Sequence, residues 1–222
     1  MDEKIETAIR KLQTGNMIFI YDGGAREGET DMVMLAKCAT QEAIRFMRKR
    51  GGLICIAVTG KVAEKMKLPF FADLLLTGGL EGLLIPKTPY GDKSAFSLTL
   101  NHRNTYTGIT DIDRARTISE FGKLADSLKT ENRKPETEFH QKFYSPGHVY
   151  VLIGRGLEKR KGHTELSLAL AEKCGSNATV ICELLGDDGK ALKPEEAEKL
   201  ADENGSVLLS GKKIIEFAGE NK

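Results

Sequence analysis

The sequence predicts an α+β fold in which a single domain, residues 1–222, packs helices on both sides of a mixed β-sheet in a three-layer α-β-α arrangement. Three observations support this prediction. Short apolar, strand-like runs are interspersed with amphipathic helical patterns, yet without the regular strand–helix–strand rhythm of a parallel sheet. No break in composition divides the chain. No repeat or low-complexity segment indicates a solenoid or a linker.

The first quarter of the chain supplies five of these elements. Residues 3–13 place apolar side chains at helical spacing, and residues 17–21 form a short apolar run typical of a strand. The apolar residues 32–39 predict a second strand. A helix follows over 40–48, where Thr40 is a suitable N-cap and two glycines stop the pattern. The continuous apolar run 53–60 then predicts a buried strand.

The remainder of the chain also contains both strand-like and helical patterns. Further strands are predicted at 96–101, 148–154, 178–186 and 206–211. Further helices are predicted at 110–128, 163–174 and 193–203, the first of them begun by a Thr-x-x-Asp capping box. Residues 128–142 are polar and charged, so we expect a surface loop there.

Composition excludes several classes of protein. The chain is 40% hydrophobic and 29% charged with a formal net charge of +1, values typical of a soluble globular protein. It lacks a basic surface for nucleic acid, and no segment approaches the roughly 20 apolar residues that span a bilayer. The N-terminal "MDEKIETAIRKL" is amphipathic rather than a signal peptide, so we expect a cytoplasmic protein with no nucleic-acid or membrane partner.

The four cysteines form no CxxC pair and no zinc-ligand spacing. Each lies in an apolar segment, where a cysteine usually packs as a small hydrophobic side chain. We therefore expect neither a disulfide framework nor a zinc site from Cys38, Cys55, Cys174 and Cys182.

An acidic stretch, "REGETDM" (26–32), follows the first predicted strand. If the segment is extended, Glu27, Glu29 and Asp31 project from one side, since side chains alternate along a strand. Carboxylates so arranged can share a divalent cation or divide the roles of acid and base, with Arg26 beside them. A solvated loop of mixed charge is the alternative.

A second candidate is the start of the helix predicted at 163–174. Arg160, Lys161 and Gly162 precede His163 and Thr164. Unpaired N–H groups at a helix N-terminus favour an anion, and an arginine adds a bidentate phosphate donor. His163 could instead face a metal ion. Ordinary N-capping is the alternative.

Two further residues are candidates for proton transfer. His148 follows a Ser-Pro-Gly turn at the start of a strand, where an imidazole can carry a proton. Glu183 lies within an apolar strand, where burial would raise its pKa. Each has a structural alternative, a satisfied histidine or a glutamate on the exposed face of the sheet. The hydroxyl-rich turn 107–110 could bind a phosphate or sugar, although helix capping also explains it.

Five motifs, in order, resemble the 3,4-dihydroxy-2-butanone 4-phosphate synthase family of riboflavin biosynthesis. They are "REGETDM" (26–32), "TGITDIDRARTI" (107–118), "SPGHVYVL" (145–152), "RKGHTE" (160–165) and "CELLGDDG" (182–189). The resemblance implies a Mg²⁺-dependent lyase, with Mn²⁺ as a possible substitute. Such an enzyme converts D-ribulose 5-phosphate to 3,4-dihydroxy-2-butanone 4-phosphate and formate. It also implies a homodimer with active sites at or near the subunit interface.

The resemblance assigns roles by motif. It makes Glu27 and His163 the metal ligands and His148 and Glu183 the catalytic residues. The residues that it implies for substrate binding, several of them shared with those roles, are Arg26, Glu27, Asp31, Arg160, Lys161, Gly162, His163, Thr164 and Glu183. Residues 122–142 then indicate a surface insertion. A metal-dependent sugar-phosphate isomerase or aldolase is the alternative activity.

Overall fold

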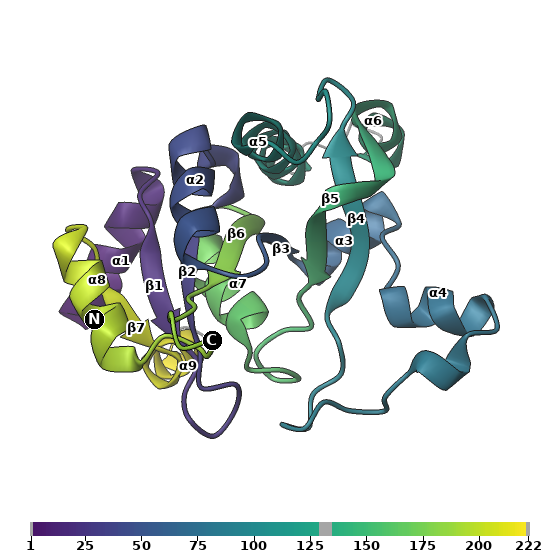
Figure 1. The fold of residues 1–222 in the computed structure, drawn as a ribbon. Helices are drawn as coiled ribbons and strands as arrows, with labels where there is room; N and C mark the ends of the chain where they lie inside the picture. The colour runs from purple at the N-terminus through teal and green to yellow at the C-terminus, as the bar shows by residue number, and fades with distance from the viewer. Residues whose placement is uncertain (1, 129–134, 221–222) are drawn as a thin grey trace.

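The structure is a computed structural model that describes residues 2–128 and 135–220. Its strands are β1 (Ile18–Tyr21), β2 (Thr30–Leu35), β3 (Cys55–Val58), β4 (Phe96–His102), β5 (Phe143–Ile153), β6 (Ala178–Glu183) and β7 (Leu208–Ser210). They form one seven-stranded sheet in the order β4-β5-β3-β6-β2-β1-β7 (Figure 1). The β3–β5 and β1–β7 pairs are parallel and the other pairs are antiparallel, so the sheet is mixed, as predicted.

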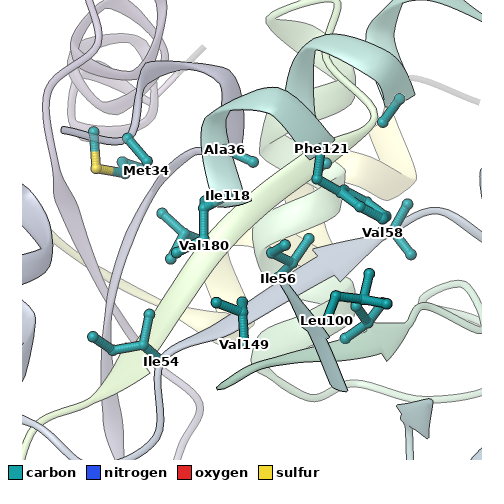
Figure 2. Close-up of a cluster of buried hydrophobic side chains, with 14 of the residues drawn as sticks. Met34, Ala36, Ile54, Ile56, Val58, Leu100, Ile118, Phe121, Val149 and Val180 are labelled. Atoms are coloured by element: carbon teal, nitrogen blue, oxygen red, sulfur yellow. The ribbon is translucent and has the colours of Figure 1, made fainter. Parts of the chain in front are cut away.

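One face of the sheet carries the larger apolar core. The helices that cover it are α2 (Gln41–Arg50), α3 (Gly60–Met66), α5 (Asp111–Ser127), α6 (Pro135–Lys142) and α8 (Pro194–Glu203). Figure 2 shows Ile118 and Phe121 of α5 above Ile56, Val149 and Val180 of the central strands. Burying such side chains stabilises the layer by about 25 cal/mol per Å² of apolar surface.

The opposite face carries a second core. Its helices are α1 (Glu3–Gln13), α7 (His163–Lys173) and α9 (Gly211–Glu220). Ile5 and Leu12 of α1, Leu166 and Leu170 of α7 and Ile214 of α9 are fully buried there. Helices on both faces of a mixed sheet confirm the predicted α+β, three-layer fold class.

The strand predicted at 32–39 is wrong in its second half. The strand β2 ends at Leu35, and Ala36–Cys38 form the 3₁₀ helix η1. The reason is tertiary, because α5 packs closely on this segment. A Cβ atom at Gly122 would overlap the backbone nitrogen of Lys37. The chain therefore turns off the sheet where α5 crosses it.

The surface loop predicted at 128–142 is also wrong for its last eight residues. They form α6, and Phe139 on this helix is buried against Phe121 and Phe143. Residues 129–134 lie outside the part of the chain that the structure describes. A single aromatic anchor holds an otherwise polar helix, so hydropathy alone did not indicate it. The predicted surface insertion at 122–142 is wrong for 122–127, which belong to α5 and bury Leu124.

Several elements were not predicted at all. They are α3, α4 (Phe71–Thr77), the 3₁₀ helix η2 (Glu81–Leu83) and α9. We call residues 71–87 the arm, because α4 and η2 project away from the body of the molecule (Figure 1). The arm exposes six large apolar side chains, Phe71, Leu74, Leu76, Leu80, Leu83 and Ile85.

The described residues contain no helix that combines the length and apolar character needed to cross a bilayer. All four cysteines are free thiols, and Cys55 and Cys182 are buried. Burial raises the pKa of the Cys55 thiol and raises that of Cys182 beyond the ordinary range. Both therefore pack as small neutral side chains, as expected.

Candidate active site

A cavity of about 140 Å³ lies beside the first turn of α7. The sheet places two carboxylates in its wall, because Asp31 at the start of β2 pairs directly with Glu183 at the end of β6. Arg160, His163 and Thr164 reach the cavity from the start of α7 and the loop before it. The lining also includes Glu27 from the loop before β2 and Thr88 and Tyr90 from the segment before β4.

The loop between β1 and β2 is folded around one carboxylate. Asp22, whose side chain is fully buried, accepts the backbone N–H groups of Glu27 (3.2 Å), Gly28 (3.0 Å) and Glu29 (3.1 Å). It also pairs with the guanidinium of Arg26 at 2.8 Å. The segment is therefore not extended as far as Glu27, since residues 24–27 form a turn and β2 begins only at Thr30. Glu27 reaches the cavity because Asp22 closes this loop.

His163 connects this loop to the sheet. Its Nε2 atom lies 3.1 Å from the carbonyl oxygen of Glu29, a distance at which Nε2–H donates a hydrogen bond. Its Nδ1 atom faces Glu27 Oε2 at 3.3 Å and Asp31 Oδ1 at 3.4 Å. A backbone acceptor on one ring nitrogen is the arrangement that directs the other toward a metal ion.

The electrostatics of this group are those of a crowded, buried acid cluster. Burial raises the pKa of Asp31 to about 7, against the favourable influence of His163. Burial alone would lower the pKa of His163, but the Asp31, Glu27 and Asp22 carboxylates raise it to about 9. Burial would raise the pKa of Glu27, but hydrogen bonds from His163, Tyr90 and Arg26 lower it to about 2. In this state a proton on His163 partly neutralises the carboxylates.

The donor set also fits a divalent cation. Asp22, Glu27 and His163 each offer a ligand atom within 4.8 Å of the others. Asp31 Oδ1 is buried and has no hydrogen-bond partner within the described chain. Clustered carboxylate oxygens with one imidazole nitrogen are suitable ligands for Mg²⁺ or Mn²⁺.

A pair of arginines lies beside the acid cluster, with Arg26 Nη1 2.8 Å from Glu27 Oε2. The guanidinium groups of Arg26 and Arg160 both pack over Gly162, where a Cβ atom would lie 2.5 Å from Arg26 Nη2 and Arg160 Nη1. Two N–H groups of this pair, Arg26 Nη2 and Arg160 Nε, are buried without a hydrogen-bond acceptor among the described residues. Gly162 is the N-cap of α7 and offers no capping side chain. This arrangement has unused capacity for an anion.

The remaining predicted site residues differ in position. Thr164 is buried and lines the cavity, whereas Lys161 is exposed. Glu183 lines the cavity and accepts the backbone N–H of Leu53 at 2.8 Å. His148 is exposed, does not line the cavity and contacts Asn101 at 3.1 Å.

The sheet register explains the separation of His148 from the cavity. Ile181 and Tyr150 flank Cys55 in the β6–β3–β5 register. Glu183 ends β6 and His148 lies within β5, and β3 separates these two strands in the sheet. Of the two residues, only Glu183 lines the cavity.

The turn 107–110 is held by structural hydrogen bonds. Asp113 accepts the backbone N–H groups of Thr107 (3.2 Å) and Gly108 (2.9 Å), and Thr110 Oγ1 accepts that of Asp113 (3.1 Å). A Cβ atom at Gly108 would overlap Asn101, the partner of His148. The turn therefore neighbours His148 and not the acidic cavity.

Three residues at the site, Asp22, Tyr90 and Asp92, were not among the predicted site residues. A carboxylate directly before two glycines is typical of a side chain that accepts backbone N–H groups in a turn, so Asp22 could have been found. Tyr90, whose ring lies 4.8 Å from the Arg26 guanidinium, and Asp92 come from the segment after the arm. Nothing in their spacing indicated that this segment folds back onto the site.

An acid cluster with a histidine, beside an arginine pair at a helix start, defines an enzyme for a small anionic substrate. The family described as 3,4-dihydroxy-2-butanone 4-phosphate synthase matches residues 6–217. A synthase of that name from Methanosarcina mazei is 43% identical, over 97% of this chain and 91% of the relative. The one from Archaeoglobus fulgidus is 40% identical, over 95% of this chain and 92% of the relative.

Solved structures agree in fold. The synthase of Candida albicans superposes with a TM-score of 0.73 at 28% identity, covering 98% of each chain. Another synthase, described as in complex with two magnesium ions, has a TM-score of 0.78 at 22% identity and covers 99% of this chain.

The chain belongs to the 3,4-dihydroxy-2-butanone 4-phosphate synthase family. Its activity is that of a lyase of riboflavin biosynthesis, the conversion of D-ribulose 5-phosphate to 3,4-dihydroxy-2-butanone 4-phosphate and formate. The family predicted from the sequence is thereby confirmed, and the alternative of an isomerase or aldolase is set aside.

Proposed function

We propose that the cavity between the Asp22-centred loop and the start of α7 is where D-ribulose 5-phosphate is converted. The observation that supports this most is the convergence of Glu27, Asp31, His163 and Glu183 from four separate segments on one space of about 140 Å³. Buried acids without full compensation are costly to fold, so their retention points to function.

Glu27 and His163 would hold Mg²⁺, or Mn²⁺ in its place. The support is that His163 Nδ1 faces Glu27 at 3.3 Å while its Nε2–H is engaged by a backbone carbonyl. Asp31 and Asp22 supply further negative charge beside the ion. A divalent ion here contributes Lewis-acid stabilisation of negative charge on substrate oxygens.

The phosphate would bind at the Arg26–Arg160 pair, beside the acid cluster. Arg26 and Arg160 offer buried N–H groups that lack acceptors among the described residues, and α7 presents its N-terminus at Gly162. Thr164 lines the same space. Lys161, although exposed, adds positive charge to the approach. Phosphate recognition of this kind fixes the sugar with respect to the acid cluster.

Several side chains are suited to move protons. The reaction begins by removal of the proton at C3, continues by loss of the C1 hydroxyl and migration of the carbon skeleton, and releases C4 as formate. Such steps require acids and bases of different pKa. Burial raises the pKa of Asp31 to about 7 and that of Glu29 above its ordinary value. These two residues, with Glu183 and His148, are the proposed proton carriers.

We also propose a cytoplasmic homodimer of single-domain subunits, with the active sites near the interface. The support is that His148 is exposed, outside the cavity of its own subunit, and that the arm exposes six large apolar side chains. Apolar patches of this kind are typical of protein–protein contact. Sedimentation at several protein concentrations tests the dimer, which a purely monomeric mass would contradict.

Formate release is the decisive assay for the proposed site and reaction together. The purified chain is incubated with ¹³C-labelled ribulose 5-phosphate, with Mg²⁺ or with EDTA, and followed by carbon NMR. We expect formate from C4 and a four-carbon phosphate, both only with Mg²⁺. An isomerase would instead conserve all five carbons, and equal turnover in EDTA would contradict the metal site.

A further inference from the structure

One carboxylate at the site has no role in the assignments above. Asp92 follows the arm and sends its Oδ2 atom between the two arginines, 3.0 Å from Arg26 Nε and 3.5 Å from Arg160 Nε. Only the contact with Arg26 is a hydrogen bond, since Arg160 Nε has no acceptor within the described residues. Asp92 therefore binds the arginine pair incompletely.

The other carboxylates near the pair contact different nitrogen atoms. Asp22 and Glu27 both pair with Arg26 Nη1 at 2.8 Å, and Glu165 pairs with Arg160 Nη1 at 2.7 Å. These partners fix the positions of the two guanidinium groups. The N–H groups that remain, Arg26 Nη2 and Arg160 Nε, are those available to an incoming anion, and Asp92 lies beside them.

The segment that carries Asp92 is joined to the site chiefly by side chains. Within it, Thr88 N–H donates to the Asp92 carbonyl (2.8 Å), Gly91 N–H donates to the Thr88 carbonyl (2.9 Å), and Asp92 N–H donates to Thr88 Oγ1 (3.1 Å). These bonds close a small turn on itself. The turn contacts the loop between β1 and β2 through the ring of Tyr90, the hydrogen bond from Tyr90 to Glu27 and the carboxylate of Asp92. These are side-chain contacts, so the turn can shift without breaking a sheet hydrogen bond.

We propose that Asp92 is an internal anion that occupies the Arg26–Arg160 pair in the empty site and is displaced by the substrate phosphate. Asp92 carries one negative charge, whereas a phosphate monoester near neutral pH carries between one and two and offers three acceptor oxygens. The phosphate therefore prevails, but it must overcome the repulsion of Asp92. Asp92 in this sense lowers affinity for every phosphate compound, and it acts as a positioning residue for the arginine pair rather than as a catalytic one.

This inference rests on the proposed phosphate site. The test uses inorganic phosphate as a competitive inhibitor at saturating Mg²⁺, together with KM and kcat for ribulose 5-phosphate. In Asp92→Asn, which keeps the size of the side chain and removes its charge, we expect the inhibition constant of phosphate and KM both to fall about three- to tenfold. We expect kcat not to rise. Asp92→Glu keeps the charge and should stay within about twofold of the wild type.

Two further variants separate the possible outcomes. Asp202→Asn, the same charge change on an exposed turn of α8, should leave both constants unchanged. Arg160→Gln tests the phosphate site itself and should weaken phosphate inhibition. If Arg160→Gln has no effect on it, the proposed phosphate site is wrong.

One outcome would overturn only the role of Asp92. In it, Asp92→Asn leaves the inhibition constant of phosphate and KM unchanged or higher, while Arg160→Gln weakens phosphate inhibition as expected. Thermal unfolding of each variant confirms that the fold is intact. Asp92→Ser provides the same charge removal if the asparagine variant does not fold.

Discussion

The Nδ1 atom of His163, in the first turn of α7, lies 3.3 Å from the Oε2 atom of Glu27, in the loop before β2. The two residues approach each other because β2 and β6 pair in the centre of the sheet while α7 packs across one face. The contact favours the charged form of both groups, in concert with Tyr90 and Arg26 beside Glu27 and with Asp31 beside His163. Both side chains would be available to one metal ion.

Replacing either residue should remove metal-dependent catalysis. We expect Glu27→Ala and His163→Ala each to lower Mg²⁺-dependent formate release by at least about a hundredfold, because the ion would lose a ligand and its position. Formate is measured by a coupled dehydrogenase assay. Near-normal turnover in either variant would contradict the assignment of Glu27 and His163 as metal ligands. Glu42→Ala, on the exposed first turn of α2, is the control and should retain activity.

We expect Asp22 to be essential for the conformation of the loop between β1 and β2. Its buried carboxylate accepts three backbone N–H groups and pairs with Arg26. We expect Asp22→Asn to lower the free energy of unfolding by about 2 to 4 kcal/mol and to weaken Mg²⁺ binding. Urea denaturation and calorimetric Mg²⁺ titration measure the two effects.

The control for Asp22 is Asp187→Asn, which makes the same chemical change in an exposed loop. It should alter neither quantity measurably. An Asp22→Asn protein with wild-type stability and Mg²⁺ affinity would mean that the loop holds its shape without this carboxylate.

The stability of the metal-free protein should fall as the pH rises above neutrality. The pKa of His163 is raised from 6.5 to about 9, so the stabilisation from its proton is complete below pH 6.5 and lost by about pH 9. The pKa of Asp31 is raised from 3.8 to about 7, so ionisation of Asp31 also lowers the stability as the pH rises, but between these two lower pH values. We expect a decrease on the order of 1 to 3 kcal/mol between pH 6.5 and 9.

Mg²⁺ should oppose this loss, since the ion takes the place of the proton on His163. Chemical denaturation in EDTA and in Mg²⁺ at both pH values measures the effect. We expect the stabilisation by Mg²⁺ to be larger at pH 9 than at pH 6.5. Equal stabilisation at the two values would show that proton and metal do not compete.

Two glycines in helices offer a test of the packing between α5 and η1. In Gly122→Ala the new Cβ atom would overlap the backbone of Lys37, so we expect a loss of about 2 to 4 kcal/mol despite the better helix propensity of alanine. Gly219→Ala, in α9, meets nothing within 4 Å and should be neutral or stabilising by up to about 1 kcal/mol. Comparable stability for both variants would contradict the close approach of α5.

Much of the fold could be predicted from local patterns. The apolar stripe of α1, the capped starts of α2 and α5 and the continuous apolar run of β3 each encode their element within a few residues. Elements held by a single long-range contact could not be predicted in this way. The helix α6 depends on Phe139, which packs against Phe121 of α5 as well as against the neighbouring Phe143.

The candidate site was also predictable only in part. The residue types were recognisable, because an Arg-Glu-x-Glu loop and an Arg-x-Gly-His helix start are unusual in a purely structural segment. Their grouping was not. Pairing of β2 with β6 brings Asp31 opposite Glu183, while the same register leaves His148 two strands away.

The sequence by itself determined the class of fold and the inventory of acidic, basic and imidazole groups, because hydrophobic periodicity and side-chain chemistry are local properties. Only the tertiary structure decided which of these groups share a space and how their charges are balanced. Desolvation and the distance between charges are set by strand register and helix packing, and these alone place a proton on His163 and bring Asp92 between two arginines.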